Sequence, residues 1–89
     1  MQKHEDTAHD GLHAQALLND PNSIYELGLK YSTGEGVDID YVTAHVWFNI
    51  AAMRGVAAAR DWRAELAREM SAAEVAEAQR RAREWLSRH

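Results

Sequence analysis

The sequence predicts an all-α fold built from two helix-turn-helix units. Apolar residues recur at helical spacing along most of the chain, no segment alternates apolar and polar residues as a strand does, and glycines separate the periodic segments. With 46% hydrophobic residues, one proline and many Ala, Leu, Glu and Arg residues, the composition is typical of a globular helical chain. A length of 89 residues allows one small domain.

The chain is predicted to divide into a tail and a helical domain. Residues 1–19 are expected to be a mobile tail, in which Leu12–Leu18 has the apolar spacing of a short helix. Residues 20–89 are expected to form the domain. Its first part, 20–55, is a complete unit, and its second, 56–89, is a degenerate terminal unit.

The first helix of the domain is predicted from Pro21 to Ser32. Asp20 can accept hydrogen bonds from free backbone N–H groups at a helix start, and proline suits the first turn. Gly34 is placed to end the helix in a left-handed conformation, and Gly36 gives the loop a second permissive position. The residues expected to face the core are Ile24, Leu27, Gly28 and Tyr31.

The second helix is predicted to follow Asp40, its N-cap, and to end at Arg54 with Gly55 behind it. Its apolar stripe at helical spacing consists of Ala44, Trp47, Phe48, Ala51 and Ala52. Two large rings among small alanines suit close packing of helix on helix. Trp47 lies in the middle of this stripe and is therefore predicted to be a core residue.

Two further helices are predicted, over Ala57–Met70 and Ala72–Ser87. Ser71 and Glu74 have the spacing of a capping box, in which each side chain satisfies a free backbone donor. In the third helix, the residues sharing a side are Ala59, Trp62, Arg63, Leu66 and Met70, with Arg63 interrupting the apolar stripe. In the fourth helix, the core-facing residues are Val75, Ala78, Ala82, Trp85 and Leu86.

The order and spacing of residues in the complete unit resemble a known repeat. The matching positions are Leu27, Gly28, Tyr31, Gly34, Gly36, Val37, Asp40, Ala44, Trp47, Ala51, Ala52 and Gly55. This pattern closely resembles the Sel-1-like repeat, a relative of the tetratricopeptide repeat. The resemblance implies antiparallel helix pairs stacked in a right-handed α-α superhelix, a short α-solenoid that serves as a scaffold for protein complexes. Residues 56–89 depart from it, as a terminal repeat often does.

The sequence predicts no catalytic residue, no cofactor and no metal site. Cysteine is absent, which excludes disulfides, thiolate metal sites and a cysteine nucleophile. His9 and His13 have the i, i+4 spacing of a metal-binding pair, but a solvated tail explains them better. His45 is interpreted as a partly exposed structural residue. The pair Gly34 and Gly36 follows a helix and has no lysine beside it, so it is not a phosphate-binding loop.

The charge distribution excludes nucleic acid as a partner. The formal net charge is −4, and the arginines of residues 72–89 alternate with glutamates, which indicates a solvated, mutually paired face. No segment reaches transmembrane length, and Met1–Asp10 has no apolar run. We therefore expect a cytoplasmic protein without a membrane partner, the alternative being a leader that has been removed.

These observations predict a non-catalytic protein-interaction module whose partner is another protein or a second copy of the chain. The first helices of the two units should line one face. The candidate contact residues on that face are Tyr25, Leu29, Lys30, Trp62 and Glu65. The alternative hypotheses are an ancillary or regulatory subunit of an enzyme and a small metal-binding protein that uses the N-terminal histidines.

Overall fold

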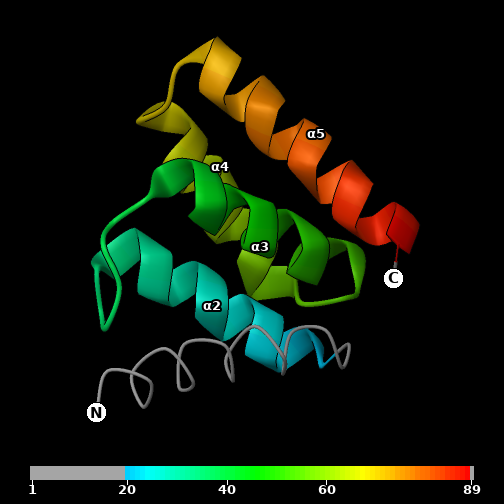
Figure 1. Cartoon of the computed structure of the whole chain (residues 1–89). Helices are drawn as coiled ribbons and strands as arrows, with labels where there is room; N and C mark the ends of the chain where they lie inside the picture. The colour runs from blue at the N-terminus through cyan, green and yellow to red at the C-terminus, as the bar shows by residue number, and fades with distance from the viewer. Residues whose placement is uncertain (1–19, 89) are drawn as a thin grey trace, which may run out of the picture.

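The computed structural model describes residues 20–88, which form four α-helices without a strand (Figure 1). The helices are α2 (Pro21–Thr33), α3 (Tyr41–Met53), α4 (Ala57–Arg68) and α5 (Ala72–Arg88). This confirms the all-α prediction and the order of the elements. Within these residues, no helix combines the length and the apolar character that a membrane crossing needs. The predicted tail, with the Leu12–Leu18 segment, lies outside the described residues.

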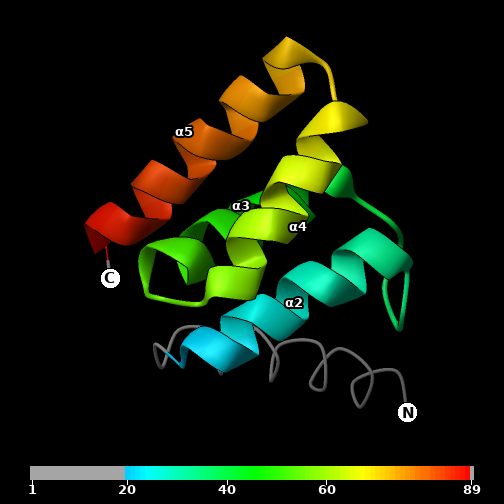
Figure 2. The ribbon, with the colours of Figure 1, turned by 180° about the vertical axis from the view of Figure 1, so that it is seen from behind.

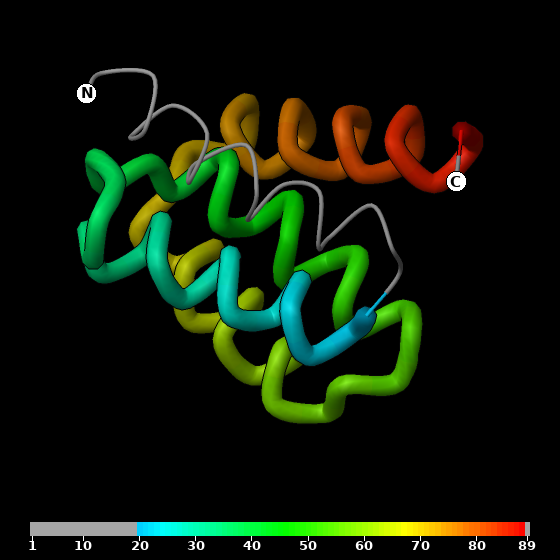
Figure 3. Tube along the Cα trace, turned by 60° about the horizontal axis from the view of Figure 1, so that its bottom comes forward, coloured from blue at the N-terminus to red at the C-terminus, as the bar shows by residue number. Residues whose placement is uncertain are grey.

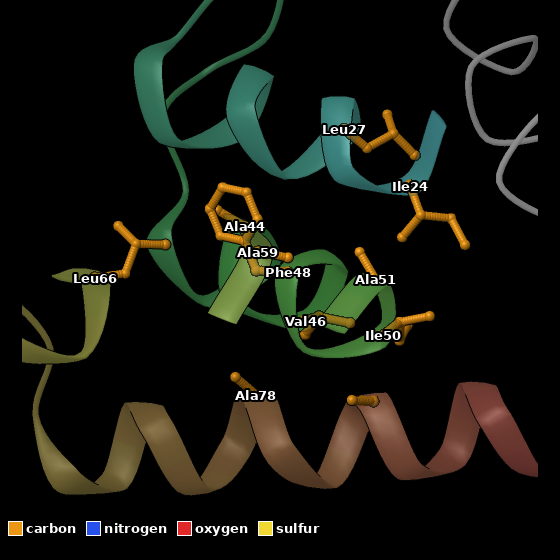
Figure 4. Close-up of a cluster of buried hydrophobic side chains, with 11 residues drawn as sticks. Ile24, Leu27, Ala44, Val46, Phe48, Ile50, Ala51, Ala59, Leu66 and Ala78 are labelled. Carbon is orange, nitrogen blue, oxygen red and sulfur yellow. The ribbon is translucent and has the colours of Figure 1, made fainter. Parts of the chain in front are cut away.

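The helix α3 is the centre of the fold. It packs against α2, α4 and α5, and consecutive helices run in opposite directions (Figures 1, 2 and 3). Figure 4 shows α3 between the side chains of Ile24 and Leu27 from α2 and Ala78 from α5. Buried residues lie on more than one side of α3, as its contacts with three helices require. They are Ala44, His45, Val46, Phe48, Ile50 and Ala51.

The predicted N-caps are present at the three helices for which they were expected. The backbone N–H of Asn22 donates to Asp20 at 3.0 Å, and that of Thr43 donates to Asp40 at 3.1 Å. At α5 the capping box is reciprocal. The N–H of Glu74 donates to the Ser71 hydroxyl at 3.1 Å, and the N–H of Ser71 donates to the Glu74 carboxylate at 2.9 Å. Each side chain satisfies a donor that the helix leaves free.

The predicted glycine turns are also confirmed. Gly34 and Gly36 have φ values of +79° and +81°, in the region where a side chain is disfavoured. After α2, the N–H groups of Gly34 and Glu35 both donate to the carbonyl of Lys30, at 2.8 and 3.2 Å. Gly55 has a φ of +102°. In the turn after α3, the N–H groups of Gly55 and Val56 donate to the carbonyls of Ala52 and Ala51, at 3.1 and 3.0 Å.

The helix α4 ends at Arg68, two residues before the predicted end at Met70. The last turn tightens: the N–H of Glu69 donates to the carbonyl of Leu66 at 2.9 Å, and the N–H of Met70 to that of Ala67 at 3.2 Å. These i to i−3 bonds satisfy carbonyls that would otherwise be free. The tightening leaves room for the capping box of α5, which starts at Ser71.

Gly28 on α2 packs closely against Phe48 on α3. Phe48 is fully buried, and a Cβ built on Gly28 would lie 2.6 Å from two of its ring atoms. A real Cβ atom essentially never lies that close to a non-bonded carbon atom. The absence of a side chain at position 28 therefore allows the phenyl ring to lie against the backbone of α2.

The prediction that Trp47 is a core residue is only partly right. The fully buried ring of α3 is Phe48, whereas Trp47 is half-buried and lies at the edge of the core. Its ring meets the ring of Trp85 edge-on, with 5.9 Å between centroids. The guanidinium of Arg54 lies 5.1 Å from the Trp85 ring. Trp47 therefore joins α3 to α5 at the surface rather than filling the interior.

Replacing Gly28 by alanine should destabilise the protein by about 1–3 kcal/mol, because the added methyl group forces Phe48 to move. In a helix without such a neighbour the same change stabilises by up to ~1 kcal/mol, so the sign of the effect is decisive. Urea unfolding measures it, with Gln79→Ala on the exposed side of α5 as the control. A gain in the free energy of unfolding for Gly28→Ala would contradict the packing described here.

Truncating the two rings of α3 should give unequal losses. Phe48→Ala should cost about 3–5 kcal/mol, as for a fully buried aromatic residue. Trp47→Ala should cost less, because the tryptophan already has part of its surface in water. The comparison is made by chemical denaturation of both variants under the same conditions. A larger loss for Trp47→Ala would show that the tryptophan, and not Phe48, fills the core.

Candidate functional site

Three aromatic rings from three helices form a row that we call the aromatic row: Tyr25 of α2, Phe48 of α3 and Trp62 of α4. The centroids of Tyr25 and Phe48 are 5.9 Å apart, and those of Phe48 and Trp62 are 6.3 Å apart. The planes of Phe48 and Trp62 differ by only 16°, so these two rings stack. Phe48 is buried, whereas Trp62 has 42% of its surface exposed.

Helical spacing puts the outer rings of the row where they are. Tyr25 follows the buried Ile24 directly, so its ring lies at the border of the buried face of α2. On α4, Ala59 and Leu66 are the buried residues, and Trp62 lies between them on the same side. Because α2 and α4 both pack on α3, the two outer rings reach Phe48 from different directions.

A polar contact anchors α4 beside the aromatic row. Arg63 donates from Nη1 to the side-chain oxygen of Asn49 on α3, at 2.8 Å, in a partly buried position. This bond explains why an arginine interrupts the apolar stripe of α4. The neutral amide oxygen takes a charge-assisted hydrogen bond, and the long stem of Arg63 covers part of the interface.

His45 is buried, which corrects the prediction that it is partly exposed. Only 2% of its surface is accessible, and Nδ1 has no hydrogen-bond partner among the described residues. Burial lowers the pKa of the imidazole, and the positive charge of Arg63 lowers it further. The exposure was misjudged because α4 covers more of α3 than the predicted stripe, since its contacts reach Asn49 as well as Phe48.

The other three candidate contact residues follow the outer rings along the same helices: Leu29 and Lys30 follow Tyr25 on α2, and Glu65 follows Trp62 on α4. Leu29 and Lys30 line a pocket of about 270 Å³ together with Glu26 and Glu35. Glu65 is exposed on α4, where its carboxylate lies 3.9 Å from the guanidinium of Arg68. An exposed pair of this kind contributes little to stability. Of the five candidate contact residues, Tyr25 and Trp62 therefore both contact the ring of Phe48. Glu65 instead forms an exposed ion pair with Arg68.

A second, larger pocket includes two residues, Asp38 and Ile39, that the sequence analysis did not single out. It is open, has a volume of about 810 Å³ and lies where the loop between α2 and α3 meets the start of α5. Its acidic lining residues are Asp38, Asp40 and Glu74, and Ile39 beside them is 60% exposed. The signal in the sequence is an isoleucine between two aspartates in a loop, where an apolar side chain has no predicted core to enter.

Two of the four arginines of α5, Arg80 and Arg81, are paired with glutamates as the sequence predicted. Glu77 accepts from Arg80 and from Arg81, in both cases at 2.7 Å, and Glu84 accepts from Arg80 at 2.7 Å. The hydrogen bond from Arg80, followed by that from Arg81, lowers the pKa of the Glu77 carboxyl group. This side of α5 is therefore a solvated polar surface.

The structure does not test a metal site at the N-terminus. His9 and His13 lie outside the described residues, and residues 20–88 contain no group of three His, Cys, Asp or Glu side chains placed to hold a metal ion.

Comparisons with family models, with curated proteins and with solved structures each gave no match to this chain. The aromatic row with its neighbouring polar contact is therefore the candidate site on geometric grounds.

The bond between Arg63 and Asn49 should be measurable in a double-mutant cycle. Arg63→Met, Asn49→Ala and the double variant are compared with the parent by urea unfolding. We expect a coupling energy of about 1 kcal/mol, since the bond is charge-assisted but only partly buried. A coupling near zero would mean that α4 is held by apolar contacts alone.

Proposed function

We propose that this chain is a non-catalytic protein-interaction module of the Sel-1-like repeat type, a short α-solenoid with one complete and one degenerate unit. The order of motif residues from Leu27 to Gly55 supports this assignment. So do the local structures at those positions: Gly28 receives a neighbouring ring, Gly34 and Gly36 have positive φ, and Asp40 caps the second helix. The right-handed superhelix is part of the same proposal.

The observation that carries the proposed function is the exposed stacking of Trp62 on Phe48. A half-exposed tryptophan with its other face held by a buried ring is a rigid apolar surface. Such a residue loses little conformational freedom when a partner covers it, which is why tryptophan is frequent among residues that dominate binding. Tyr25 and Trp62 stand on the first helix of each unit, on the face expected to bind.

The surroundings of the one histidine within residues 20–88 support a non-catalytic role. A catalytic histidine needs access to a substrate and a partner that orients it. Among the described residues the one histidine is His45, which is buried and has an unpartnered Nδ1. We propose a protein, or a second copy of this chain, as the partner.

Trp62→Ala should weaken association with the partner about 30-fold or more, as expected for a residue worth at least ~2 kcal/mol in binding. The full chain is immobilised, proteins from the native host are captured and identified, and the purified partner is titrated by calorimetry. Arg83→Ala on the exposed face of α5 is the matched control and should bind like the parent. Equal affinity of Trp62→Ala and the parent would refute this surface.

Two further measurements separate the alternatives. Sedimentation at rising concentration tests self-association, which Trp62→Ala should reduce if the partner is a second copy. A titration with zinc tests the metal-binding alternative at His9 and His13, with His9→Gln as the control. Tight stoichiometric zinc binding that His9→Gln abolishes would favour the metal-binding hypothesis over the proposed module.

A further inference from the structure

The buried histidine lies at the interface between α3 and α4. His45 precedes Phe48 by three residues and Asn49 by four, so the three side chains share one side of α3. Phe48 stacks on Trp62 and Asn49 accepts from Arg63, and both of these partners belong to α4. The imidazole is therefore covered by α4, next to the polar contact that anchors that helix.

The surroundings of the imidazole disfavour a positive charge. From α4, Arg63 acts on His45 as a like charge. The residues that α2 buries are Ile24, Leu27 and Gly28, and those that α5 buries are Ala78 and Ala82, all of them uncharged. Burial and the charge of Arg63 both oppose protonation, and together they outweigh a hydrogen bond to the backbone of His45 itself, which favours it.

The helix that covers His45 is α4, and few contacts hold it to the rest of the domain. It packs against α3 but has little contact with α2 or α5, and it buries only Ala59 and Leu66. Its N-cap is Val56, whose side chain makes no capping hydrogen bond, in contrast to the caps of α2, α3 and α5. A helix with few buried contacts opens at a lower free energy than the rest of a domain.

We propose that His45 is an acid-sensitive switch: its protonation places a second cation beside Arg63 under α4 and releases that helix from α3. The release would separate Trp62 from Phe48 and so dismantle the aromatic row. The consequence for binding rests on the proposed function, whereas the release itself does not.

The sign of the effect follows from proton linkage. Because the folded pKa is below the ordinary value of 6.5, the open state binds more protons than the closed state between these two values. Closure of α4 is therefore fully favoured above pH 6.5 and weakens as the pH falls towards the folded pKa. One proton per opening makes the opening constant rise about tenfold for each pH unit in that window.

Backbone hydrogen exchange of the full chain, between pH 7.5 and 5 and corrected for the intrinsic rates, tests the switch. We expect the opening constant of amides in Ala57–Arg68 to rise about tenfold per pH unit below 6.5, while α2, α3 and α5 change less. His45→Gln, a neutral residue of similar size, should abolish this rise, and His89→Gln is the matched control. The measurement needs no partner, so its outcome does not depend on the proposed function.

Two results would overturn the switch: the same pH dependence in His45→Gln as in the parent, or opening of all four helices together. If His45→Gln does not fold, Arg63→Met tests the same idea, since removing the neighbouring cation should flatten the rise. The ring resonances of His45 in the parent supply an independent reading by NMR. They should titrate below the ordinary value of 6.5, and a midpoint at that value would also overturn the proposal.

Discussion

The contact between Gly28 and Phe48 is the constraint on which the rest of this structure depends. Because position 28 has no side chain, the Phe48 ring can lie against the backbone of α2 and still remain fully buried. The same ring then offers its other sides to Tyr25 and Trp62, from the helices on either side of α3. Gly28 therefore determines how closely α2 packs against α3, and the Phe48 ring, which also stacks on Trp62, links this packing to α4. The candidate binding surface is a consequence of this core contact rather than an addition to it.

Those parts of the fold that depend on local chemistry could be predicted from the sequence. Caps at Asp20, Asp40 and Ser71 involve residues two or three positions apart, and the left-handed turns at Gly34 and Gly36 depend on single residues. Such signals need no knowledge of tertiary structure, so the starts of the helices were placed correctly. The end of α4 was missed by two residues because its last turn tightens before the cap of the next helix.

What the sequence could not show is which sides of α3 are covered. The predicted stripe from Ala44 to Ala52 assumes that α3 has one buried face. On this assumption the burial of Trp47 was overestimated and that of His45 underestimated. Val46 and Ile50 lie outside that stripe and are buried as well. A helix that is apolar on all sides is one surrounded by neighbours, so these two residues carried a signal for a central helix. For the site, Tyr25 and Trp62 could be placed on one face, but their meeting at Phe48 required the packing of three helices.

The four helices contribute differently to stability, and the helix that carries Trp62 has few buried residues. The outer side of α5 is covered by the ion pairs around Glu77 and Arg80, so this end of the domain faces water at little cost. The helix α4 lacks a polar cap and buries two residues, yet it carries Trp62. Under the proposed function, a partner that covers Trp62 would bind only the state in which α4 is docked, and it would therefore stabilise that state by mass action. The same linkage would act in reverse: anything that loosens α4, such as the proposed proton on His45 or the loss of the bond between Arg63 and Asn49, would reduce the fraction of molecules that present this surface. Affinity for the proposed partner would then depend on the docking of α4 as much as on the rings that touch the partner.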